Sequence, residues 1–200
     1  MFGESRRVTG DRKAKDGEAP EGPQGKDSKN QNEKIDPELL KKKNFDSDFW
    51  RFKCTKPEGL QEMPIGEKDK ATGMKHAWQG EKHSVRMGVR IYAWSLKSKK
   101  YTIDQLIESK MKWWKTRVKP KNSKEPKLDK KFKDIPMVKK GTKLELIGRS
   151  TRRERWIYII IECKNDRMYQ LEIYSMGDTS DRTWGKRIDQ FIKSFKPQKK

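Results

Sequence analysis

The hydrophobic pattern between residues 143 and 174 predicts three consecutive antiparallel strands, over 143–149, 155–163 and 167–174. The middle segment is apolar at nearly every position, with Trp156, Tyr158 and Ile160 on one side and Ile157, Ile159 and Ile161 on the other. Such a strand lies inside a sheet that is covered at least partly on both faces. The third segment alternates apolar and polar side chains, which is typical of a half-buried strand. These three strands form the part of the chain around which the rest is organised.

Three further strands are predicted upstream, over 48–55, 74–78 and 85–94. In the first, the alternation places Trp50, Phe52 and Cys54 inward. The strand ends at Pro57, because proline has no N–H to continue a ladder. The third has apolar residues at every second position from 85 to 93. The positions between them carry Arg86, Gly88, Arg90, Tyr92 and Trp94.

Two amphipathic helices complete the predicted fold. The first runs from 102 to about 118, where Thr102 and Gln105 fit a capping box at its start. The second runs from 178 or 180 to 195, with apolar residues at helical spacing. The order is β-β-β-α-β-β-β-α, which predicts an α+β sandwich with one mainly antiparallel sheet of about six strands and two flanking helices.

The composition divides the chain into a leader and one domain. Residues 1–44 contain few apolar side chains, so we expect a disordered charged leader. Residues 45–200 hold every Trp and Tyr and form the predicted single α+β domain. Within it, residues 119–140 form a long Lys-rich connection broken by prolines, which we interpret as a mobile or functional loop.

The charge is strongly positive and unevenly distributed. The chain has 50 Lys and Arg against 29 Asp and Glu, a net charge of +21. The leader is nearly balanced, so the excess lies in the predicted domain. Such a field attracts polyanions or acidic protein surfaces. Lys exceeds Arg heavily, which weakens the case for sequence-specific reading of nucleic acid, because bidentate base contacts favour Arg.

The candidate binding residues are cationic and fall in two segments. Four arginines crowd the first hairpin connection of the organising strands, and four lysines lie in the Lys-rich loop. They are Arg149, Arg152, Arg153 and Arg155, with Lys121, Lys124, Lys130 and Lys131. On the long strand, Tyr92 and Trp94 beside Arg86 and Arg90 could stack on bases. The favoured interpretation is that these aromatics are core residues beneath a helix.

Other candidate chemistry is weak. His76 and His83 could converge across a hairpin, but a structural metal site needs three or four ligands, so a surface pair is favoured. Cys54 and Cys163 could pair if their strands are neighbours, although buried free thiols are favoured. No nucleophile motif or phosphate-binding glycine loop occurs. We therefore expect no enzyme activity, no metal and no cofactor.

The order of elements resembles the PsbP-like group. This group is named for the extrinsic oxygen-evolving protein of photosystem II and shares its fold with a Ran-binding nuclear-import factor. The likeness covers residues 48–196 and rests on the strand end Pro57-Glu-Gly-Leu60, the helix after the long strand, and the terminal pattern Trp184…Ile188…Ile192-Lys-Ser-Phe195. It implies a non-enzymatic binding or assembly protein and carries over no functional residue. The chain departs from the group in its extreme basic charge and in having no visible export signal.

The leading hypothesis is a non-enzymatic interaction or assembly module that binds an acidic protein partner through these cations. The alternative is a nucleic-acid- or ribosome-associated protein that uses the same surface, and a minor alternative is a small-ligand-binding domain or hydrolase with a cleft between helix and sheet. No window is apolar enough to cross a membrane, and no signal peptide is visible. The chain as written is therefore expected in the cytoplasm, unless a misassigned start hides an export signal.

Overall fold

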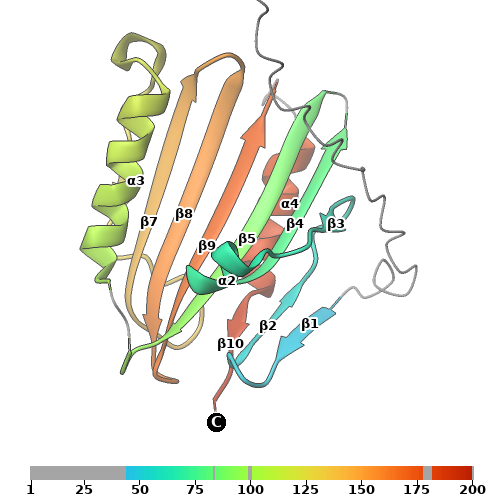
Figure 1. Cartoon of the computed structure of the whole chain (residues 1–200), viewed down its shortest axis with the longest axis vertical. Helices are drawn as coiled ribbons and strands as arrows, with labels where there is room; N and C mark the ends of the chain where they lie inside the picture. The colour runs from blue at the N-terminus through green and yellow to red at the C-terminus, as the bar shows by residue number, and fades with distance from the viewer. Residues whose placement is uncertain (1–43, 83, 99–100, 178–181, 200) are drawn as a thin grey trace, which may run out of the picture. The chain divides into compact units, whose positions relative to one another are not determined.

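The computed structural model describes residues 44–82, 84–98, 101–177 and 182–199 (Figure 1). Its main sheet has seven strands in the order β3-β4-β5-β9-β8-β7-β6, and neighbouring strands are antiparallel. These strands are β3 (Gln61–Glu62), β4 (Met74–Lys82), β5 (Val85–Ser95), β6 (Lys127–Asp129), β7 (Val138–Arg149), β8 (Arg153–Cys163) and β9 (Arg167–Met176). The predicted α+β class and the mainly antiparallel sheet are confirmed.

A smaller sheet of three strands lies beside the main sheet. It contains β1 (Asn44–Ser47), β2 (Phe52–Thr55) and β10 (Lys196–Pro197), in the order β1-β2-β10. The helices are α2 (Glu67–Ala71), α3 (Ile103–Arg117) and α4 (Arg182–Ser194), with one 3-10 turn, η1 (Pro120–Asn122). None of the described helices is long and apolar enough to cross a membrane.

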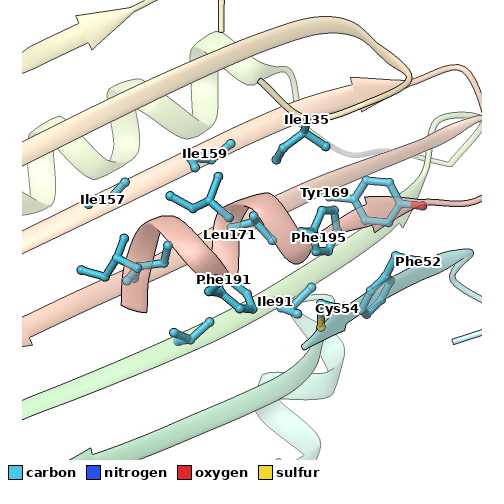
Figure 2. Close-up of a cluster of buried hydrophobic side chains, with 14 of the residues drawn as sticks. Phe52, Cys54, Ile91, Ile135, Ile157, Ile159, Tyr169, Leu171, Phe191 and Phe195 are labelled. Carbon is cyan, nitrogen blue, oxygen red and sulfur yellow. The ribbon is translucent and has the colours of Figure 1, made fainter. Parts of the chain in front are cut away.

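The principal core lies between the main sheet and α4. Figure 2 shows Ile91, Ile157, Ile159, Tyr169 and Leu171 from the strands gathered around Phe191 and Phe195 of the α4 segment. This is the apolar face that the alternation predicted. Burial of such side chains contributes about 1.5–3 kcal/mol each. The core therefore fixes α4 against the centre of the sheet.

The other long helix, α3, covers the opposite face of the sheet over β7 and β8. Ile103, Ile107 and Trp114 pack there against strand residues such as Leu144 and Tyr158. The predicted capping box is present, since Thr102 N donates to Gln105 Oε1 at 2.9 Å and Gln105 N donates to Thr102 Oγ1 at 3.2 Å. The helix therefore begins where the sequence indicated.

The first predicted strand, 48–55, is instead one arm of a hairpin. β1 and β2 are joined by a turn at residues 48–51, in which Arg51 has a φ of 55° and its N–H donates to Ser47 O at 2.6 Å. Phe52 and Cys54 are buried as predicted, whereas Trp50 lies half-buried in the turn. Ser47 Oγ accepts from Trp50 N at 3.3 Å, so a side chain satisfies part of the turn backbone where the strand breaks.

The Lys-rich segment 119–140 is shorter as a loop than we predicted. It contains η1 and β6, and β7 begins at Val138 rather than at residue 143. Phe132 and Ile135 are buried within the segment and anchor it to the domain. The apolar residues that fasten it are isolated among lysines and prolines, so they produced no periodic signal.

A histidine lies between the two sheets. The His76 ring stacks on Trp78 of β4, and its centroid is 5.1 Å from that of Phe45 in β1. Burial lowers the pKa of His76 below its ordinary 6.5, although nearby Glu62 opposes this shift. The neutral ring is therefore the form that fits the folded protein.

We expect the free energy of unfolding to fall as the pH drops below 6.5, since the unfolded chain then binds a proton at His76 that the folded protein resists. The stabilisation by the neutral ring is complete above pH 6.5, the pKa of His76 in the unfolded chain. It is lost as the pH falls toward the lowered pKa of the folded protein. His76→Phe keeps an aromatic ring and should flatten this part of the profile, measured by urea denaturation between about pH 5 and 8. His83→Gln, which removes the other histidine of the chain, is the control and should keep the slope.

Candidate functional site

Four of the predicted cations line one hollow at the end of β7. The hollow has a volume of ≈ 630 Å³, and Lys121, Lys124, Arg149 and Arg153 lie around it. They come from η1, the segment after it, the end of β7 and the start of β8. The remaining lining residues are Asn122, Ser123, Ile147, Gly148 and Gly177. We call this site the basic hollow.

The lysines are held against the sheet by backbone contacts along the edge of β7. Ser123 forms an isolated antiparallel bridge with Gly148, and Lys124 N donates to Ile147 O at 2.8 Å. Gly148 permits this approach, because a Cβ atom there would lie 2.7 Å from Trp114 Cζ2 of α3. The segment after α3 is thus seated beside Arg149.

A buried carboxylate ties the β7–β8 hairpin to the end of α3. Glu154 is 1% exposed, and Arg117 donates to it from Nε at 2.6 Å and from Nη2 at 2.9 Å. Ser150 Oγ and Trp156 Nε1 also donate to this carboxylate. Burial alone would raise the pKa of Glu154, but these hydrogen bonds outweigh it and hold the pKa below its usual range. These hydrogen bonds to Glu154 fix the position of the neighbouring Arg153.

The cations of the basic hollow have no acidic partner among the residues that the structure describes. Within the described part of the chain, Lys121, Lys124, Arg149 and Arg153 make no ion pair with a carboxylate. Glu154, the residue after Arg153, is already bound by Arg117. The hollow therefore presents several positive charges with free donors to an anion.

The other predicted cations lie elsewhere. Arg155 donates from Nε to Glu145 Oε1 at 2.8 Å, so its charge is compensated. Arg152 is exposed in the hairpin turn and does not line the hollow. Lys130 and Lys131 follow β6, six or more residues along the edge from the Ser123 bridge, about 20 Å at 3.3 Å per residue.

The aromatic face of β5 is mostly core, as favoured. Tyr92 is buried with Met74 and Ala77, and Trp94 packs against the same cluster. Arg90 is bound to Glu172 of β9. Tyr92 is therefore a core residue, as favoured, whereas Trp94 is only partly buried.

The remaining candidates give no site. Cys54 and Cys163 are free and buried, as favoured, and burial raises the pKa of each thiol to about 12. His83 lies outside the described residues, so the predicted histidine pair is not tested. No cluster of three or more potential metal ligands occurs among the residues that the structure describes.

Sequence reasoning missed the residues that shape the basic hollow. Gly148 carried a signal, since a glycine inside a strand often marks a close backbone approach. Arg117 and Glu154 carried none, because their pairing requires the hairpin to fold back on α3.

Comparisons with known proteins place the fold. No protein-family model matches the chain, and no curated protein matches its sequence. Among solved structures, the chain is similar to cyanobacterial PsbP (CyanoP) from Synechocystis sp. PCC 6803, with 12% identity, 77% of this chain and 91% of that chain covered, and a TM-score of 0.50. Two others have lower TM-scores. LpqN of Mycobacterium tuberculosis has 6% identity, covers 74% of this chain and 83% of its own, and has a TM-score of 0.48. The Saccharomyces cerevisiae Ran-binding protein Mog1p has 7% identity, covers 78% of this chain and 95% of its own, and has a TM-score of 0.46. The likeness to CyanoP concerns the fold alone, and the chain has the PsbP-like fold that its order of elements predicted.

Proposed function

We propose that this protein is a non-enzymatic interaction module that binds an acidic protein partner through the basic hollow. The observation that carries the proposal is the convergence of Lys121, Lys124, Arg149 and Arg153 around one hollow without acidic partners among the described residues. Carboxylates of a partner would meet two arginines that can each bind in bidentate fashion. The high net charge of +21 would speed the encounter.

The chemistry of the lining favours binding over catalysis. Ser123 is the only hydroxyl residue in the described lining of the hollow, and its Oγ donates to Pro120 O at 3.1 Å. Among the described residues, no histidine, cysteine or carboxylate residue lines this hollow to serve as a general base or an acid. A serine without a base is a poor nucleophile.

The same lining favours an acidic protein over single-stranded nucleic acid. Base stacking needs exposed aromatic rings beside the cationic groove. No aromatic residue among those described lines the basic hollow, and Tyr92 of β5 is buried. A peptide rich in Glu and Asp requires only the cations.

The test is a charge reversal at two residues of the hollow. We expect Arg149→Glu with Arg153→Glu to weaken binding of a fluorescent Glu- and Asp-rich peptide by about tenfold or more, because two attractive contacts become repulsive. Fluorescence anisotropy at physiological salt measures the effect, and a DNA duplex and a single-stranded RNA of equal charge serve as competing probes.

The matched control is Lys130→Glu with Lys131→Glu. It removes the same amount of charge from exposed positions that lie away from the hollow. A loss limited to the arginine variant supports the site. Equal losses in both variants would mean that net charge alone attracts the peptide, and tighter binding of either nucleic acid would favour the alternative function.

A further inference from the structure

A second hollow lies between the β3–α2 connection and the face of the main sheet that α3 leaves open. Its volume is ≈ 260 Å³. Its lining comes from the connection, α2, β4, β5 and β9, so it shares no residue with the basic hollow. These residues are Met63, Pro64, Asp69, Met74, Ala77, Trp78, Gln79, Arg90, Tyr92 and Tyr174.

The outer wall of this hollow is fastened to the sheet by hydrogen bonds. Met63 N donates to Ala77 O at 2.8 Å, and Trp94 Nε1 donates to Thr72 O at 3.2 Å. Gly73 has a φ of +98°, and its Cα lies so close to the Trp94 indole that a Cβ atom would clash at 2.3 Å. The hollow is therefore formed before any ligand arrives, which lowers the entropy cost of binding.

One side of the hollow carries a fixed cation. Arg90 donates from Nη1 to Glu172 Oε1 at 2.8 Å, and its guanidinium lies 5.3 Å from the centre of the Tyr174 ring. The Arg90 side chain is still 38% exposed, so a ligand in the hollow can reach its charge. Beside it, Gln79 accepts from Tyr174 through Oε1 at 2.8 Å, which leaves the Gln79 amide N–H groups free to donate.

The lining also carries an anionic residue and several apolar residues. Asp69 of α2 forms no ion pair within the described residues and does not pair with Arg90, although both line this hollow. Met63, Met74 and Ala77 contribute apolar side chains to the same lining. A β-bulge between Met74 and His76 shifts the register of β4 at this point.

We propose that this second hollow binds a free α-amino acid with an apolar side chain. The carboxylate of the ligand would face Arg90 and Gln79, its ammonium group would face Asp69, and its side chain would contact Met63, Met74 and Ala77. At ≈ 260 Å³ the hollow has room for a small ligand of this class. Leucine and methionine each have nine non-hydrogen atoms. This site is independent of the proposed function, because it uses other strands and other charges.

The test is a titration of the full chain with L-leucine and L-methionine, followed by isothermal calorimetry and by amide shifts in NMR spectra. Leucinamide lacks the carboxylate and N-acetyl-leucine lacks the ammonium charge, so each should bind at least about tenfold more weakly than leucine. Shifts should centre on the β3–α2 connection and β4. No binding of either amino acid, or equal binding of all three leucine compounds, would overturn the proposal.

Two variants on one helix separate the site from general charge. Asp69→Asn removes the proposed partner of the ammonium group and should weaken leucine binding by about tenfold. Glu67→Gln removes the same charge from an exposed residue of α2 that pairs with Lys70 and does not line the hollow, so it should leave binding unchanged. An equal loss in both variants, or no loss in Asp69→Asn, would contradict the assignment.

Discussion

Replacing Phe52 with Ala is expected to lower the free energy of unfolding by about 3–5 kcal/mol, the usual cost of deleting a buried phenylalanine ring. Phe52 is 0% exposed and stacks on Phe195 at 5.2 Å between ring centroids, and its ring lies 5.9 Å from that of Tyr169. It joins the small sheet to the principal core (Figure 2). Urea denaturation followed by tryptophan fluorescence measures the loss.

The same hairpin offers a matched control. Phe49 is 73% exposed in the turn between β1 and β2, so Phe49→Ala should change the free energy of unfolding by no more than about 0.5 kcal/mol. A loss below about 1 kcal/mol for Phe52→Ala would show that the small sheet is not part of the cooperative core.

The second large effect is expected at Arg117. Arg117→Ala should lower the free energy of unfolding by about 2–3 kcal/mol at neutral pH, since it leaves the buried Glu154 carboxylate without its cation. We place the loss below the full cost of breaking a buried pair, because the Arg117 side chain is 33% exposed and water screens it. Ser150 and Trp156 still donate to the carboxylate and limit the damage.

The pH dependence identifies the cause. The folded-state pKa of Glu154 lies below its ordinary value of 4.5, so its stabilising effect is present above pH 4.5 and is lost as the pH falls through the lowered pKa. The gap between wild type and Arg117→Ala should therefore narrow at acid pH. Arg155→Ala is the control, since its partner Glu145 is more exposed than Glu154, and it should cost less than about 1 kcal/mol. Equal losses in the two variants would contradict a special role for the buried carboxylate.

The elements that the sequence predicted well are those whose period extends over many residues. β5, β8 and β9 each have ten or more residues, and α3 has 15, so alternation or helical spacing is unmistakable. The strands β1, β3, β6 and β10 have two to four residues, too few to establish a period. β3 and β6 form where the longer strands β4 and β7 present an edge to them, and β1 and β10 both pair with the short strand β2.

The cationic chemistry of the candidate site was predictable, but which residues come together to line it was not. A hairpin necessarily brings Arg149 and Arg153 together, and their Cα atoms are register partners in the β7–β8 ladder. The register that places Glu145 within reach of Arg155 depends on the turn, and the return of residues 123 and 124 along β7 depends on contacts with Gly148. Neither is encoded in local composition.

The two outermost strands of the main sheet bear on how the protein behaves at high concentration. The edges of the main sheet are formed by β3 and β6, which have only two and three residues. Lys127 lies within β6, and Lys130 and Lys131 follow it. Beyond β6, the backbone of Phe132 lies against β7, where a Cβ atom on Gly141 would be 2.3 Å from Phe132 O. Short, charged edges of this kind deny a second sheet the row of free N–H and C=O groups that fibril growth requires.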